Sequence, residues 1–359
     1  MSKVRLGEVA FEHKETCKGD KSNLPVVGLE HLVPAEVTLS LWDECSDNTF
    51  TKVFRKGNVL FGRRRAYLKK AAVAPFDGIC SGDITVIEAK AEKLLPELLP
   101  FIIQNDALFD FAVEKSAGSL SPRVKWEHLR EFEFELPEMS KQKQLAEVLW
   151  SMDTTKKAYK NLIKCTDELV KSQFIEMFRE TEKVRLDAIA DIMMGQSPTS
   201  DSYNFDGNGL PFYQGSADFS EKYVVTRMYC STPTRVAEAG DILMSVRAPV
   251  GTVNLTDKKC CIGRGLAAIR SKKSQDCNDF LLYAFRVKEE EIAAMGQGST
   301  VLSINKDKLH AIMMPNASQE QQEQFIAFAR QSDKSKFELE QSLAELTATY
   351  KRIISENLG

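Results

Sequence analysis

The chain has 359 residues, of which 43% are hydrophobic and 28% charged, and its formal net charge is −3. This length predicts two or three domains with buried cores. No run of 18 apolar residues occurs, which excludes a membrane-spanning helix of ordinary length. The slightly acidic balance excludes a protein that coats DNA by net charge alone, so the distribution of charge along the chain matters more.

The cysteines and the N-terminal segment indicate the compartment. The eight cysteines include no C-x-x-C pair and the four histidines are scattered singly, so no zinc site is expected. The N-terminal segment "MSKVRLGEVAFEHK" lacks the apolar core of a signal peptide. We therefore expect reduced thiols and a cytoplasmic location.

The first half of the chain predicts a mixed domain followed by a long helix. Short apolar runs with turn residues between them predict β-strands at residues 23–29, 83–89 and 131–137. Residues 96–114 predict a helix within the same domain. Residues 140–179 contain no proline or glycine, and apolar residues recur every three or four positions. A helix of this length spans about 60 Å, so its apolar stripe is expected to pack on another helix.

The second half repeats this order. Its strands, helix and long helix are predicted, in turn, at residues 210–216, 241–246, 266–271, 279–295 and 318–357. The two long helices are expected to pair with each other. Lys156 and Lys336 interrupt the two apolar stripes at matching positions, which indicates an imperfect seam that needs a partner for stability.

The two halves form an internal repeat of about 180 residues. "VRLGEVA" from Val4 matches "VRLDAIA" from Val184, an offset of 180, and "GNVLFGRRRA" from Gly57 matches "GDILMSVRAP" from Gly240, an offset of 183. The small drift in the offset is what loop insertions would produce. The chain is therefore interpreted as a tandem duplication of one unit and not as a solenoid of short repeats.

Basic residues gather in each half. Residues 51–70 hold eight lysines and arginines, residues 258–273 hold six, and neither run contains an acid. Arg64 aligns with Arg247 across the repeat. A guanidinium group can donate two parallel hydrogen bonds to a guanine edge or a phosphate, and the glycine turns near these arginines in both halves let backbone amides approach a phosphate. Repetition of this pattern favours nucleic-acid binding over two merely solvated faces.

Polar loops in both halves add further side chains that are able to contact bases or phosphates. The loop at residues 115–123 aligns with that at 295–306, and residues 194–204 and 211–219 add glutamine and tyrosine. The predicted DNA-contacting residues are Arg63, Arg64, Arg65, Tyr67, Lys69, Lys70, Lys115, Ser119, Arg123, Gln196, Ser197, Tyr213, Gln214, Arg247, Arg264, Gln297, Ser299 and Lys306.

Two other classes of function fit the sequence less well, an enzyme acting on DNA and a structural scaffold. Pro75, Asp77, Glu88 and Lys90 imitate the carboxylates and lysine of a metal-dependent nuclease, but the repeat replaces both carboxylates in the second half. A methyltransferase acting on adenine usually carries an N/D-P-P-Y/F motif, which is missing here. A purely structural coiled-coil scaffold is disfavoured because most residues lie in the globular units.

Together, "GDILMSVRAPVG", "CCIGRGLAAI", "MGQSP", "PFYQGSADF" and the long helix that ends each half resemble the specificity subunit of type I restriction-modification systems. The resemblance covers the entire chain. It implies an α+β fold with two mixed α/β target recognition domains in tandem repeat, held apart by two long antiparallel coiled-coil helices. The implied domains are residues 1–139 and 181–316, and the implied spacer helices are residues 140–180 and 317–359.

The resemblance also implies the function and the partners. Such a subunit is not catalytic by itself and reads an asymmetric bipartite DNA target. It docks two methyltransferase subunits and, where the host provides them, two restriction subunits. No cofactor or metal is expected on this chain, whereas S-adenosylmethionine, ATP and Mg²⁺ belong to the partners. "GRRRAYL" in the first half stands where the second has "SVRAPVG", so the two domains are expected to read different sequences.

Overall fold

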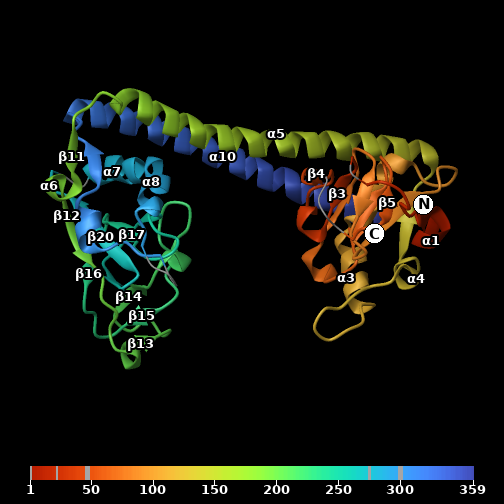
Figure 1. The fold of residues 1–359 in the computed structure, drawn as a ribbon, viewed down its shortest axis with the longest axis horizontal. Coiled ribbons are helices and arrows are strands. Elements are labelled where there is room, and N and C mark those ends of the chain that lie inside the picture. The colour runs from red at the N-terminus through yellow and green to blue at the C-terminus, as the bar shows by residue number, and fades with distance from the viewer. Residues whose placement is uncertain (1, 22, 45–48, 274–275, 298–301) are drawn as a thin grey trace. The chain divides into compact units, whose positions relative to one another are not determined.

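The computed structural model describes residues 2–21, 23–44, 49–273, 276–297 and 302–359. The chain forms two compact units, the first made of Met1–Asn161 and Leu339–Gly359 and the second of Leu162–Glu338. Two long helices, α5 (Met139–Phe178) and α10 (Gln319–Leu358), each contribute one part to each unit (Figure 1). Neither helix contains proline or glycine, so nothing in its sequence interrupts the backbone hydrogen bonds.

The first unit combines two four-stranded sheets with short helices. Its elements before α5 are β1 (Ser2–Arg5), α1 (Leu6–Val9), β2 (Ala10–Glu12), β3 (Pro25–Val27), β4 (Asp43–Glu44), β5 (Lys52–Phe54), β6 (Val59–Gly62), β7 (Ala71–Val73), β8 (Gly78–Cys80), β9 (Ile84–Ala89), α2 (Leu99–Ile103), α3 (Asp106–Glu114), α4 (Trp126–Leu129) and β10 (Glu133–Leu136). One sheet has the order β2-β9-β6-β7 and is antiparallel throughout. The other has the order β4-β3-β8-β5, with β3 and β8 parallel, and β1 pairs with β10.

The second unit repeats this plan. Its elements are β11 (Lys183–Arg185), α6 (Leu186–Ile189), β12 (Ala190–Met194), β13 (Tyr203–Asn204), β14 (Leu210–Tyr213), β15 (Tyr229–Cys230), β16 (Val236–Ala237), β17 (Ile242–Ser245), β18 (Val253–Leu255), β19 (Cys260–Ile262), β20 (Leu266–Ser271), α7 (Asp276–Val287), α8 (Glu289–Ala294), α9 (Lys306–His310) and β21 (Met313–Pro315). The sheet β12-β20-β17-β18 corresponds to β2-β9-β6-β7. The sheet β13-β15-β14-β19-β16 again contains one parallel pair, β14 with β19, and β11 pairs with β21.

Within each unit, one end of α5 packs against the opposite end of α10. In the first unit, Leu149 of α5 shares a core with Ile354 and Leu358 of α10. In the second, Phe174 of α5 shares a core with Phe325 of α10, and their rings meet edge to face at 5.1 Å. The pairing in each unit is therefore antiparallel, as the resemblance implies.

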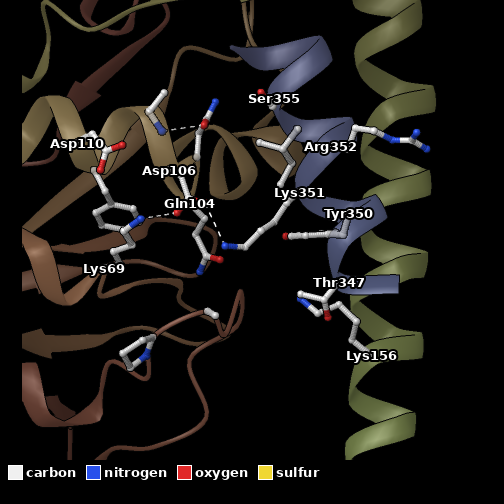
Figure 2. Close-up of a pocket in the computed structure, with 16 residues that line it drawn as sticks. Lys69, Gln104, Asp106, Asp110, Lys156, Thr347, Tyr350, Lys351, Arg352 and Ser355 are labelled. Carbon is white, nitrogen blue, oxygen red and sulfur yellow. Dashed lines mark hydrogen bonds and ion pairs between the residues drawn. The ribbon is translucent and has the colours of Figure 1, made fainter. Parts of the chain in front are cut away.

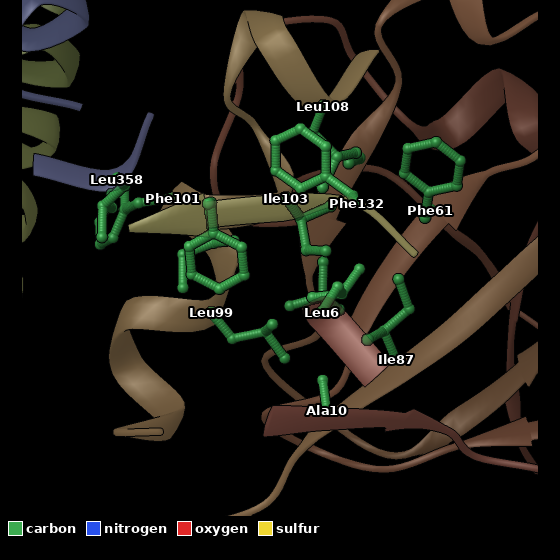
Figure 3. Packing of buried hydrophobic residues seen from close by; sticks show 14 of the residues in the cluster. Leu6, Ala10, Phe61, Ile87, Leu99, Phe101, Ile103, Leu108, Phe132 and Leu358 are labelled. Atoms are coloured by element: carbon green, nitrogen blue, oxygen red, sulfur yellow. The ribbon is translucent and has the colours of Figure 1, made fainter. Parts of the chain in front are cut away.

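The main core of the first unit lies between the antiparallel sheet, the short helices and the long-helix ends (Figure 3). Phe61 of β6 stacks on Phe109 of α3 with ring centroids 5.6 Å apart, and Phe101 of α2 contacts Tyr350 of α10. The apolar strand residues alternate toward this core, while a second cluster fills the space between the two sheets. The fold class expected from the sequence is confirmed.

The predicted helices inside the two domains are both broken. The single helix expected at residues 96–114 is a short 3₁₀ turn followed by α2 and α3, because Asn105 adopts an extended conformation and caps α3 by accepting from the Ala107 amide at 3.0 Å. The helix expected at residues 279–295 is divided into α7 and α8 at Lys288. Among the described helices, none is long and apolar enough to cross a membrane.

Candidate nucleic-acid interface

A hairpin in the first unit holds two arginines side by side. Ala117 and Arg123 exchange backbone hydrogen bonds of 3.0 and 2.9 Å, and Arg123 also forms a backbone bridge with Arg64, which follows β6. The Arg64 Nε donates to Ser121 Oγ at 2.5 Å. Asp83 accepts from Arg123 Nε at 2.7 Å and lies 3.5 Å from the Arg64 guanidinium. The hydrogen bond from Arg123 lowers the pKa of Asp83, so that carboxylate stays ionised between the two cations.

The second unit contains the same frame with different side chains. Gln297 and Ser303 exchange two backbone hydrogen bonds of 2.9 Å, and Ser303 bridges to Arg247, which follows β17. The Arg247 side chain is exposed and makes no ion pair with a described residue. The alignment of Arg64 with Arg247 thus corresponds to one backbone geometry in both units. Ser303 stands where the first unit has Arg123.

The turn after Arg64 presents one cation and one aromatic ring outward. Arg65 and Lys69 both have left-handed backbone conformations, with φ of 54° and 51°, and they flank a 3₁₀ turn. The Arg65 amide donates to the Pro122 carbonyl at 2.8 Å, which ties the turn to the hairpin. Tyr67 is 54% exposed and Arg65 is exposed with no ion pair in the described chain. An exposed ring beside a free guanidinium suits a nucleic-acid backbone and its bases.

Other predicted cations of the first unit are held by the protein itself. Lys69 Nζ donates to Asp106 at 2.6 Å, Lys70 Nζ donates to the Leu29 carbonyl at 2.7 Å, and Lys115 lies 2.7 Å from Glu114. The Nε of Arg63 is buried without a partner among the described residues. Ser119 is exposed at the hairpin tip. The run at residues 51–70 is therefore less available as a charged surface than its sequence indicates.

Two loops of the second unit meet closely. Gly195 packs so tightly on the Gly263 carbonyl that a β-carbon at Gly195 would lie 2.2 Å from it. This contact brings Gln196 and Ser197 beside Arg264, whose amide donates to Ser197 Oγ at 3.2 Å. Gln196 and Arg264 are exposed, so their side chains are free to face a ligand.

Tyr213 and Gln214 differ in placement although both were predicted to contact DNA. Tyr213 is fully buried, its hydroxyl lies 2.8 Å from Thr226 Oγ1, and burial raises its pKa to about 12. It is a core residue in this structure because β14 turns it toward the space between the sheets, and we leave it out of the proposed surface. Gln214, the next residue, is exposed.

The remaining predicted residues of the second unit lie on its hairpin and after it. Gln297 and Lys306 are exposed, and Lys306 begins α9. Ser299 lies outside the described residues. Within the basic run at 258–273, Arg270 makes two hydrogen bonds to the buried Asp241, at 2.6 and 2.8 Å, which makes it a structural residue.

The residues that imitate a nuclease serve the fold. Asp77 accepts from Arg55 at 2.9 Å, Glu88 bonds His13 at 2.7 Å, and Lys90 donates to the Gly7 carbonyl at 2.8 Å. No three His, Cys, Asp or Glu side chains in the described ranges are grouped to hold a metal ion.

Two candidate residues were missed from the sequence, one in each unit. Asp83 positions both Arg64 and Arg123. The only signal for it in the sequence was that the basic run at residues 51–70 contains no acid and needs one from elsewhere in the chain. Phe205 is 76% exposed in the turn between β13 and β14. A lone aromatic residue among asparagine, aspartate and glycine was the available signal.

Comparison with known proteins places this architecture in a family. Both halves of the chain, residues 2–164 and 179–348, match the type I restriction modification DNA specificity domain. The MjaX specificity subunit of Methanocaldococcus jannaschii, named as part of a type I restriction enzyme, is 27% identical over 352 residues. That match covers 89% of this chain and 81% of the relative.

Solved structures agree with this assignment. A chain in a structure on complex assembly and conformational transition of the type I R-M system is 31% identical. It has a TM-score of 0.67 and covers 99% of this chain and 97% of that chain. The type I restriction-modification S subunit from M. genitalium shares the fold with a TM-score of 0.59 at 12% identity, covering 100% of this chain and 96% of that one. The chain belongs to the family of type I restriction-modification specificity subunits, which recognise DNA and are not themselves catalytic.

Proposed function

We propose that each unit reads one half of an asymmetric, bipartite DNA target through the surface around its hairpin and aligned arginine. The observation that carries this proposal is the shared backbone frame, in which Arg64 bridges to Arg123 and Arg247 bridges to Ser303. A shared frame fixes how each domain approaches DNA, whereas different side chains on it select different bases. The domain limits proposed from the sequence, 1–139 and 181–316, enclose these two frames.

In the first unit, the proposed contacts centre on the 3₁₀ turn and the hairpin. Arg65 and Tyr67 are exposed, and Ser119 lies at the hairpin tip. Arg64 and Arg123 are held by Asp83 in the free chain. An arginine that donates two hydrogen bonds to a base edge would give up part of its contact with Asp83. Asp83 is therefore proposed as a positioning residue.

In the second unit, the proposed contacts are exposed side chains on four loops. Arg247 lies beside the hairpin, Arg264 and Gln196 lie on the two loops that meet at Gly195, and Gln214 follows β14. Glutamine is able to bind adenine through two hydrogen bonds, and arginine binds guanine in the same way.

The proposed assembly contains two methyltransferase subunits and, where the host has them, two restriction subunits in the cytoplasm. The duplicated architecture supports this count, because two similar units offer two similar docking places to identical partners. S-adenosylmethionine, ATP and Mg²⁺ would be bound by those partners and not by this chain.

The test is a chimera in which a second copy of residues 1–139 replaces residues 181–316. Expressed with its methyltransferase, the natural chain should direct methylation to an asymmetric bipartite target, as methylome sequencing would report. The chimera should direct methylation to a target whose two halves are inverted copies of one another. An active chimera that keeps the natural target would disprove independent reading by the two units, and methylation of DNA by the repurified chain alone would disprove its non-catalytic role.

A further inference from the structure

The first unit contains a pocket of about 540 Å³ where α3 faces the ends of the long helices. Figure 2 shows Tyr350 and Lys351 reaching from α10 toward the side where Gln104 and Asp106 lie, while Lys156 comes from α5. Asp106 is shared by Lys69 at 2.6 Å and Lys351 at 3.0 Å. All of these residues belong to the first unit.

Two polar side chains of the pocket are largely buried, one without a hydrogen-bond partner and the other without an ion pair among the described residues. The Tyr350 side chain is only 5% exposed, and its hydroxyl has no hydrogen-bond partner among the described residues. Lys156 is 7% exposed and makes no ion pair with any residue that the structure describes. Its ammonium group lies 4.2 Å from the centre of the Tyr350 ring. A buried hydroxyl without an acceptor and a largely buried cation without an ion pair are both costly, and an incoming acceptor would lower both costs.

The carboxylate nearest to Lys156 along α5 is already engaged. Asp153, one helical turn earlier, pairs with Lys157 at 2.8 Å. Burial lowers the pKa of Lys156, and the attraction of Asp153 does not compensate for it. Lys156 thus lies in a site that lacks a full counter-charge.

The second unit has the equivalent pocket, of about 350 Å³, with its cation satisfied. Lys336, 180 residues after Lys156, lies 3.0 Å from Asp167 and 2.7 Å from Glu221. Burial alone would lower the pKa of Lys336, but the hydrogen bonds to Glu221 and Asp167 outweigh it, and the pKa is raised. The first unit has Thr347 at the position of Asp167, and so lacks one of these two carboxylates.

We propose that the pocket of the first unit binds a carboxylate, which would accept from Lys156 and Tyr350 as Asp167 and Glu221 accept from Lys336. The lysines of this pocket, Lys69, Lys156 and Lys351, outnumber its aspartates, Asp106 and Asp110, so the local charge favours an anion. The volume admits a small organic acid or a single acidic side chain from a partner chain.

The test measures binding of succinate to the full chain by calorimetry, with inorganic phosphate at matched ionic strength as the second probe. The unchanged chain should bind succinate saturably and in preference to phosphate. Lys156→Met should weaken binding by roughly ten- to hundredfold, the factor expected for a charged hydrogen bond. Lys336→Met, the matched control in the second unit, should leave succinate binding unchanged.

A second variant tests the same site without removing its cation. Thr347→Asp gives the first unit the carboxylate that Asp167 provides in the second, so it should pair with Lys156, raise the thermal midpoint and abolish succinate binding. No saturable succinate binding by the unchanged chain would overturn the proposal. Binding that survives both Lys156→Met and Thr347→Asp, or a preference for phosphate, would also overturn it.

The source of the carboxylate is decided by repeating the titration with the methyltransferase subunit bound, the one step that depends on the proposed assembly. Loss of succinate binding there would assign the site to an acidic side chain of the partner. Retention would assign it to a free organic acid. ¹⁵N NMR of the lysine side chains gives a readout independent of affinity, because an occupied site should raise the pKa of Lys156.

Discussion

Arg64 and Arg247 occupy the same place in the two units, each bridged through its backbone to the second arm of a hairpin. Their side chains are held differently. The Arg64 guanidinium bonds Ser121 and lies near Asp83, whereas Arg247 is exposed without an ion pair to any described residue. The second unit therefore offers its arginine to a ligand directly, and the first must release part of an internal contact.

Arg247→Ala should weaken recognition of one half-site only. If Arg247 donates two hydrogen bonds to a guanine, its loss should cost about 1–3 kcal/mol of DNA-binding free energy and relax base preference at one position of that half-site. Binding to DNA libraries randomised in each half in turn would measure this. Arg64→Ala is the matched control and should act on the other half-site. Equal weakening on every sequence would instead identify both arginines as phosphate contacts or structural residues.

Arg65 and Lys69 should differ in their contribution to the salt dependence of DNA binding. Arg65 makes no ion pair within the described residues, so Arg65→Ala should flatten the slope of log K against log salt by roughly 0.9. Lys69 is bound to Asp106 at 2.6 Å, so Lys69→Ala should change the slope much less. Titrations of DNA binding over a range of salt concentrations measure the slope for both variants. A larger change for Lys69 would show that DNA displaces Asp106.

Some features of the fold and of the candidate site could be predicted from the sequence, and others could not. The long helices and the repeat were predictable, since forty residues without proline or glycine and matching motifs are local properties. The availability of a charge was not, because its partner comes from elsewhere in the chain: Arg55 bonds Asp77, and Arg270 bonds Asp241. Tyr213 shows the same limit for burial, because its neighbours in the core come from distant strands.

Lengthening both long helices should lengthen the unread gap of the target. We consider four residues inserted after Lys160 in α5 and after Ala344 in α10, which keeps the Lys156–Tyr350 and Lys336–Asp167 contacts in register. Four residues are about one helical turn and add about 6 Å. At about 3.4 Å per base pair, the gap should grow by one or two base pairs while both half-site sequences stay the same. Methylome sequencing measures the gap, and an active variant with an unchanged gap would show that the helices do not set it.

Asp83→Asn should destabilise the chain at neutral pH and have little effect in acid. The pKa of Asp83 is lowered in the folded state by Arg123, so its ion pair contributes above the unfolded-state value of about 3.9 and is lost as pH falls through the folded-state value. We expect a deficit of about 0.5–1 kcal/mol at pH 7, since Arg123 is partly exposed. Urea unfolding at pH 7 and pH 3 measures the difference between variant and natural chain, with Asp110→Asn as a control. That difference should narrow as the pH falls below about 3.9, because the unfolded natural chain then takes up a proton that the folded chain binds only at lower pH. A deficit of the same size at pH 7 and pH 3 would assign the effect to the amide and not to the ion pair.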